Sequence, residues 1–217
     1  MKTFQLEGSP REIVGKKATK ALRKQGLIPA ILYGQDPVQL PFEGVLKKGE
    51  KVVEIGSGKG VIVTDFVVTA DNVRSLIYSP HIYLVELALE GVRATKAIIK
   101  DLQFHPVTDA LLHIDFLEVF DKKPIVMEVP VVLEGHAEGV KAGGKLNLEM
   151  RKLRVRALYD KVPEKLTINV ETLGLGKAIQ IGNLHFEGLE LINAKNAVVC
   201  SVKLTRAARG LEAAKEK

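Results

Sequence analysis

The sequence predicts a mainly β protein, in which a small N-terminal β-barrel with short helices is followed by a second all-β domain. Three observations support this fold class. Short runs of alternating apolar and polar residues recur along the chain, and glycines and prolines separate them at short intervals. A charged break with a proline, FDKKP, divides these runs near residue 120. Strands this closely spaced favour a barrel, because closure leaves no open edges.

The length of 217 residues is comfortable for two domains. We expect a barrel domain at 1–119, a short linker at 120–124, a second β domain at 125–205 and a helical or frayed tail at 206–217. With 46% hydrophobic and 27% charged residues the composition is globular, and the net charge of +6 favours acidic partners.

The single cysteine, Cys200, excludes a disulfide framework and indicates a reducing compartment. It lies in the apolar run AVVCSV, so we expect a small buried hydrophobe rather than a nucleophile. The N-terminus has no apolar segment of signal length, and no apolar run approaches 18 residues. These features predict a cytoplasmic protein with no membrane partner.

The elements expected in the first domain follow from periodicity and from helix and turn signals. In chain order they are a strand at 3–8, a helix at 14–25 ended by Gly26, a strand IPAILYG ending in a turn at Tyr33–Gly34, a β-hairpin within 45–65, a helix at 69–80 with Thr69 as its cap, and three strands in IYLVELALEG, ATKAIIKDLQF and LLHIDFLEV. The hairpin tip GSGKG lacks the spacing of a phosphate-binding loop, and we expect no cofactor.

The second domain is expected to contain strands separated by glycine-rich loops. The strand-like segments are PIVMEVPVVLEG, KLRVRALY, KLTINVETL, LELI and AVVCSVKL. The loop at 133–146 holds four glycines, which permit close approach to a backbone or a surface. A flexible hairpin loop would have the same composition, so this segment alone does not indicate a site.

A basic segment near the N-terminus is the least balanced part of the composition. On a helix, five cations would fall within an arc of about 120°, with Arg11 just before them: Lys16, Lys17, Lys20, Arg23 and Lys24. No acidic residue lies between Glu12 and Asp36, although surface helices usually intersperse Glu with Lys. The segment is either a solvated lysine-rich face or a surface for a polyanion, of which nucleic acid is the most available.

The segment QFHPVTDALLHIDF gathers polar residues that allow two interpretations. Spacing of four between His105, Asp109 and His113 would align three metal ligands on a helix, which would suit a metal-dependent enzyme. Pro106 disfavours that helix, and LLHIDFLEV alternates as a strand. On a strand His113 and Asp115 point the same way and form a shared polar surface. We favour the strand, and therefore no metal and no catalysis.

Several ordered motifs together resemble a known family. GKKATKALRKQGLIPAILYG, KDLQFHP, LLHIDF and, in the second domain, PVVLEGHAEGVKAGGKL are similar to the bacterial large-subunit ribosomal protein twenty-five family, in its two-domain form related to the general stress protein Ctc. The resemblance covers most of the chain. It implies a structural component of the large ribosomal subunit whose N-terminal barrel binds 5S rRNA in the minor groove, the wide and shallow groove of A-form RNA.

The resemblance assigns roles to particular residues. It implies that six cations meet phosphates, that Tyr33 and Gly34 approach the sugar and base surface, and that four polar side chains form the binding face of the barrel. The cations are Arg11, Lys16, Lys17, Lys20, Arg23 and Lys24, and the polar residues are Gln103, His105, His113 and Asp115. Asp115 is expected to accept a hydrogen bond from a base amino group or a 2′-hydroxyl.

The resemblance leaves three points open. The second domain can contact 23S rRNA, a neighbouring ribosomal protein or the first domain. Segment 35–62 looks longer than is usual in the family and has no assigned role. A stress-related RNA-binding protein acting off the ribosome would share the same chemistry and differ only in its partner.

Overall fold

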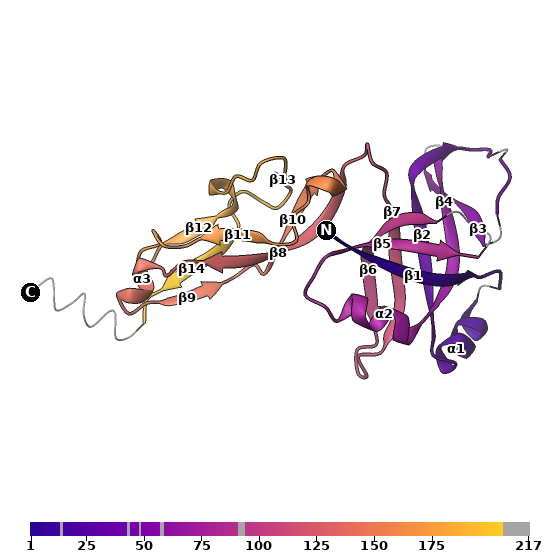
Figure 1. The fold of residues 1–217 in the computed structure, drawn as a ribbon, viewed down its shortest axis with the longest axis horizontal. Helices are drawn as coiled ribbons and strands as arrows, with labels where there is room; N and C mark the ends of the chain where they lie inside the picture. The colour runs from indigo at the N-terminus through magenta and orange to yellow at the C-terminus, as the bar shows by residue number, and fades with distance from the viewer. Residues whose placement is uncertain (14, 43, 48, 57–58, 91–93, 206–217) are drawn as a thin grey trace, which may run out of the picture. The chain divides into compact units, whose positions relative to one another are not determined.

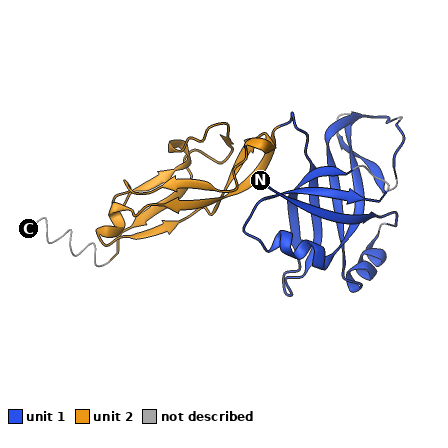
Figure 2. Cartoon of the chain, in the orientation of Figure 1, with its two compact units in different colours: residues 1–123 blue, residues 124–217 orange. Residues whose placement is uncertain are grey.

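The computed structural model describes residues 1–217 except 14, 43, 48, 57–58, 91–93 and 206–217. The expected tail therefore lies outside the described residues, as does Val14 of the expected basic helix. The chain forms two compact units, residues 1–123 and 124–217 (Figure 2). Each is mainly β, which confirms the predicted fold class. None of the described helices is both long and apolar enough to span a membrane.

The first unit is a closed barrel (Figure 1). Its described elements are β1 (Lys2–Pro10), α1 (Lys16–Lys24), β2 (Leu27–Gln39), β3 (Glu50–Gly56), β4 (Lys59–Thr69), α2 (Ala70–Ile77), β5 (Tyr83–Leu89), β6 (Thr95–Phe104) and β7 (Leu111–Glu118). Six strands pair in the order β1-β5-β6-β7-β2-β4, and β1 pairs again with β4 through Ser9–Val67 and Pro10–Phe66. That last pairing closes the barrel, and β3 extends it as a hairpin with β4.

Alternate residues of these strands fill the barrel. Phe66 and Phe116 are fully buried, with ring centroids 5.7 Å apart. Val73 and Leu76 of α2 are also buried in this core. Where β1 meets β4, a Cβ atom on Gly8 would lie 2.9 Å from the Phe66 ring and 3.1 Å from the Val67 carbonyl oxygen. The barrel closes this tightly because Gly8 has no side chain.

The structure differs from three local predictions for the first unit. The turn predicted at Tyr33–Gly34 is wrong, because β2 continues to Gln39 and absorbs the irregularity as a register shift between Tyr33 and Pro37. Helix α1 begins at Lys16 and ends at Lys24, within the expected bounds of 14–25. Gln25 is its C-cap, and Gly26 follows with a φ of +75° that favours glycine. Thr69 is the N-cap of α2, but its side chain makes no capping hydrogen bond.

The second unit contains two sheets. Its described elements are β8 (Ile125–Glu134), α3 (Glu138–Lys141), β9 (Lys145–Leu148), β10 (Lys152–Ala157), η1 (Tyr159–Lys161), β11 (Leu166–Asn169), β12 (Ala178–Gln180), η2 (Ile181–Asn183), β13 (Glu190–Leu191) and β14 (Val198–Lys203). One sheet has the order β11-β8-β10-β13 and the other β12-β14-β9. Cys200 is fully buried on β14, and burial raises the pKa of its thiol, which confirms the small buried hydrophobe.

The glycine-rich segment 133–146 was expected to be a loop, but it contains the short helix α3. The amide of Gly139 donates a 2.9 Å hydrogen bond to the Leu173 carbonyl oxygen. A Cβ atom on Gly139 would lie 2.6 Å from the carbonyl carbon of Gly174. This glycine therefore permits close backbone approach, as expected, and the neighbouring backbone belongs to the same unit.

Candidate nucleic-acid interface

Helix α1 presents an uncompensated row of cations. Lys16, Lys17, Lys20 and Lys24 are exposed, and none of them makes an ion pair with a residue that the structure describes. The opposite face packs only in part, since Ala18 and Leu22 are half-buried and Ala21 is exposed. A helix with so little burial is held in place mainly by its contacts at either end.

Two arginines make those contacts. Before the helix, Arg11 donates from Nε to the Ile13 carbonyl oxygen at 2.7 Å and from Nη2 to Thr19 Oγ1 at 2.8 Å. In its last turn, Arg23 donates from Nε and Nη2 to the Leu112 carbonyl oxygen at 3.1 and 2.8 Å. These arginines, expected only as phosphate contacts, position the helix. Each uses two of its five N–H groups, so donors remain for a phosphate.

The outer face of the barrel beside α1 is polar. Ile31 on β2 lies opposite Asp65 on β4 and Asp115 on β7, and Gln103 on β6 lies opposite His113. Residues opposite one another on paired strands share a face, as do residues two apart on one strand. Gln103, His113 and Asp115 therefore share one outer face with Tyr33, which lies two residues beyond Ile31.

His113 and Asp115 are held together on this face. His113 Nδ1 lies 2.8 Å from Asp115 Oδ1, and both atoms are buried without another partner among the described residues. The two side chains are 19% and 17% exposed. Since Nδ1 and Oδ1 themselves are buried, the accessible surface belongs to the other atoms of each side chain. The part of each side chain that is exposed can meet a ligand.

Tyr33 contributes a neutral phenol. Burial raises its pKa, and the carboxylates of Asp115 and Asp65 raise it further, so the hydroxyl stays protonated and can donate a hydrogen bond. Lys100 Nζ lies 4.8 Å from the centroid of the Tyr33 ring. The register of β6 shifts between Ile99 and Asp101, and Lys100 is the extra residue.

Lys100 and the neighbouring pair of Lys51 and Asp65 are site residues that the sequence did not reveal. Lys51 Nζ lies 2.6 Å from Asp65 Oδ2, so the two side chains form an ion pair on this face. The bulge in β6 brings Lys100 to the site, and the pairing of β3 with β4 brings Lys51 next to Asp65. Neither leaves a periodic signal in a single sequence.

Two predicted site residues lie elsewhere. His105 is in the turn before β7, where its Nδ1 accepts hydrogen bonds from the amides of Val107 and Thr108, each at 3.2 Å. Gly34 does not share the outer face with Tyr33. A Cβ atom there would lie 3.1 Å from the Ile62 carbonyl oxygen and 3.7 Å from Glu118 Oε2. Its neighbours therefore supply a packing reason for this glycine.

The alternative metal site does not form. Residues 105–110 make a turn closed by a hydrogen bond from the His105 amide to the Ala110 carbonyl oxygen, and β7 begins at Leu111. Asp109 has a φ of +52°, outside the helical region. The helix that would align His105, Asp109 and His113 is therefore absent, and the described residues contain no group of three potential protein ligands for a metal.

The chain resembles known proteins over its whole length. Residues 6–54 and 45–116 match the model of the ribosomal L25p family, and residues 124–206 match the model of ribosomal protein TL5, C-terminal domain. Three curated relatives are named large ribosomal subunit protein bL25. That of Porphyromonas gingivalis is 61% identical, covering 100% of both chains. That of Parabacteroides distasonis is 60% identical, covering 98% of this chain and 99% of the relative. That of Bacteroides fragilis is 51% identical, covering 99% and 98%.

Proposed function

Because this chain belongs to the ribosomal L25p family of large-subunit proteins, we propose that it binds 5S rRNA through α1 and the outer face of the barrel. The chain is a structural ribosomal protein and not an enzyme, and its binding chemistry is that of a ribonucleoprotein component. The finer assignment, to 5S rRNA and to particular residues, rests on the geometry described above.

The observation that carries this proposal is the lysine row of α1 (Lys16, Lys17, Lys20 and Lys24), which the Arg23 contact holds next to the polar outer face of the barrel. Arg23 bonds to Leu112, the residue directly before His113, so cations and polar groups are presented together. Lysines make sequence-independent contacts to phosphates. Tyr33, Gln103, His113 and Asp115 offer donors and acceptors for base edges and 2′-hydroxyls, which a wide minor groove exposes.

A carboxylate within a phosphate-binding surface also supports base or sugar contact. Asp115 would be repelled by phosphate alone, whereas it can accept a hydrogen bond from an amino group or a hydroxyl. Its contact with His113 holds it on the exposed face. The lysine row then provides most of the affinity and the polar face most of the discrimination.

The test is a binding titration of the full chain with a 5S rRNA transcript and with a size-matched structured RNA. We expect both RNAs to bind at low salt and the preference for 5S rRNA to persist as salt rises, because phosphate contacts are screened and base contacts are not. Equal affinities for the two RNAs throughout would contradict the proposal. Co-sedimentation with large subunits then shows whether the protein acts on the ribosome or away from it.

A further inference from the structure

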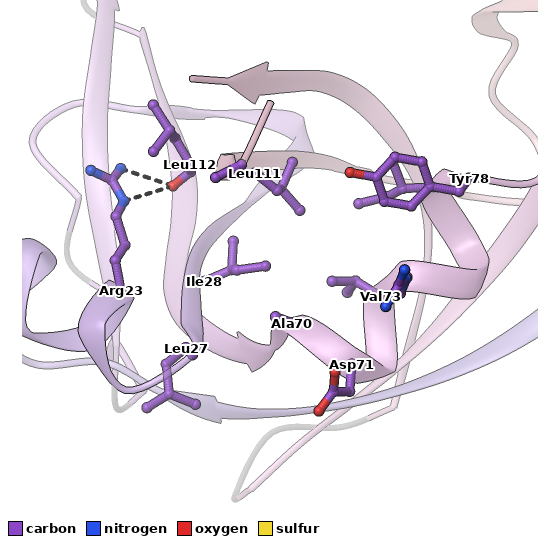
Figure 3. A pocket seen from close by; sticks show the side chains of 13 residues that line it. Arg23, Leu27, Ile28, Ala70, Asp71, Val73, Tyr78, Leu111 and Leu112 are labelled. Atoms are coloured by element: carbon purple, nitrogen blue, oxygen red, sulfur yellow. Dashed lines mark hydrogen bonds between the residues drawn. The ribbon is translucent and has the colours of Figure 1, made fainter. Parts of the chain in front are cut away.

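A pocket lies beside the lysine row, where α1 and α2 approach the start of β7. Its volume is about 520 Å³, within the roughly 300–1,000 Å³ of small-ligand sites. Figure 3 shows the side chains of Arg23, Leu27, Ile28, Val73, Tyr78 and Leu111 arranged around it. No element of the described chain fills this space, and neither the polar face nor the lysine row uses it.

The pocket combines apolar walls with a cationic and aromatic rim. Leu27, Ile77 and Leu111 are among the aliphatic residues that line it. Tyr78, directly after α2, is 66% exposed, so most of its surface is open to a ligand. The guanidinium group of Arg74, one turn earlier, makes no hydrogen bond or ion pair with any other residue that the structure describes. An exposed aromatic ring beside an unpaired guanidinium is a common surface for a planar, anion-bearing ligand.

We propose that this pocket receives an unpaired nucleobase of the bound RNA, stacked against Tyr78 and with its flanking phosphate on Arg74. This inference rests on the proposed function and extends its binding surface from α1 to α2. Proteins that recognise RNA sequence commonly stack splayed-out bases on aromatic rings or on arginine planes. The apolar walls would cover the faces of the base, and the rim would bind the phosphate attached to it.

Charge and continuity favour a nucleotide over a protein side chain. Arg23 and Arg74 both line the pocket against a single acid, Asp71. Arg23 also belongs to the last turn of α1, one residue before the exposed Lys24. A strand of RNA that crosses the lysine row would therefore pass the mouth of the pocket. An apolar protein segment would gain nothing from this excess of cations.

The test uses the full chain, a 5S rRNA transcript, and variants that remove the ring, remove the charge or fill the space. Tyr78→Ala should weaken binding about tenfold without changing the salt dependence. Arg74→Ala should flatten the plot of log affinity against log salt by about one unit. Ala70→Phe, at an exposed position that lines the pocket, should reproduce the loss seen with Tyr78→Ala. Ala88→Phe, at an exposed position on β5, is the matched control.

Chemical probing of the RNA identifies the occupant. Dimethyl sulfate and a carbodiimide together report the Watson–Crick edges of all four bases. We expect one unpaired base to be protected by the wild-type chain and by Ala88→Phe, and to become reactive again with Tyr78→Ala and Ala70→Phe. That pattern supports the inference and places the base in the sequence of the RNA.

Two results would overturn the inference and leave the proposed function standing. In the first, Tyr78→Ala and Ala70→Phe bind 5S rRNA and protect its bases as the wild-type chain does. In the second, Ala70→Phe binds the free RNA normally but fails to join large subunits, which would assign the pocket to another ribosomal component. Failure of the wild-type chain to bind 5S rRNA would remove both proposals together.

Discussion

The guanidinium group of Arg23 donates two hydrogen bonds, of 3.1 and 2.8 Å, to the carbonyl oxygen of Leu112, 89 residues further along the chain. His113 follows Leu112 directly, so this contact fixes the last turn of α1 beside the strand that carries His113 and Asp115. Because α1 has no fully buried residue, the contact accounts for much of its orientation. The proposed RNA-binding surface is therefore assembled before RNA binds.

Replacing Arg23 by lysine should separate its charge from its geometry. Lysine keeps the positive charge, but it lacks the planar guanidinium group whose two N–H groups donate to the Leu112 carbonyl oxygen. We expect Arg23→Lys to bind 5S rRNA several-fold more weakly, with an unchanged salt dependence, and the amides of α1 to exchange faster with solvent deuterium. Lys24→Ala, at the next position, should flatten the salt dependence and leave exchange unchanged. Wild-type exchange rates in Arg23→Lys would refute the positioning role.

Replacing Asp115 by asparagine distinguishes base contact from bulk electrostatics. The change removes a charged acceptor, so we expect a loss of about 2 kcal/mol in binding free energy with no flattening of the salt dependence. If only net charge mattered, losing an acid would strengthen binding instead. Glu7→Gln, an exposed carboxylate on β1, is the control and should have little effect. Tighter binding by Asp115→Asn would rule out its acceptor role.

A methyl group at Gly8 tests how the barrel closes. Gly8→Ala would place an atom within about 3 Å of the Phe66 ring and the Val67 carbonyl oxygen. We expect the free energy of unfolding to fall by about 1–3 kcal/mol, measured by urea denaturation. Ser9→Ala, at the exposed neighbouring position, is the control. Equal stability of Gly8→Ala and wild type would mean that β1 and β4 can separate without cost.

Glu118 should make stability depend on pH. Burial raises its pKa, and the carboxylate of Glu50 raises it further. A carboxyl group with a raised folded-state pKa stabilises the fold at pH values below its unfolded pKa and loses this contribution as pH rises through the folded value. We therefore expect Glu118→Gln to raise the melting temperature at pH 7, and the difference to shrink as pH falls through the raised folded-state pKa until it is lost below about pH 4.3. A constant difference across this range would exclude titration of Glu118 as the cause.

The sequence was most informative where periodicity and composition carried the signal. Alternation along LLHIDFLEV placed His113 and Asp115 on one face of β7, and the structure confirms that they are in contact. Gly26 ended the basic helix, as expected, because its positive φ suits glycine. Both features depend on local conformation, which a few neighbouring residues determine.

The remaining features depend on pairing between distant residues. The bulge that turns Lys100 toward Tyr33 and the pairing that carries Lys51 to Asp65 arise from strand register, which no local pattern encodes. The same is true of Arg23. Its charge was evident from the sequence, whereas its acceptor, the Leu112 carbonyl oxygen, lies 89 residues further along the chain. Composition therefore located the basic surface but not the contacts that orient it.

Salt-dependent binding of a lysine variant tests most directly whether α1 meets RNA phosphates. Lys16 and Lys20 are exposed, and their side chains make no ion pair with a described residue. Lys2 and Lys59 are exposed lysines of the same unit that lie outside the helix. We expect Lys16→Ala with Lys20→Ala to flatten the plot of log affinity against log salt by about two units, and Lys2→Ala with Lys59→Ala to leave it unchanged. Equal slopes for the two double variants would show that α1 does not contact RNA.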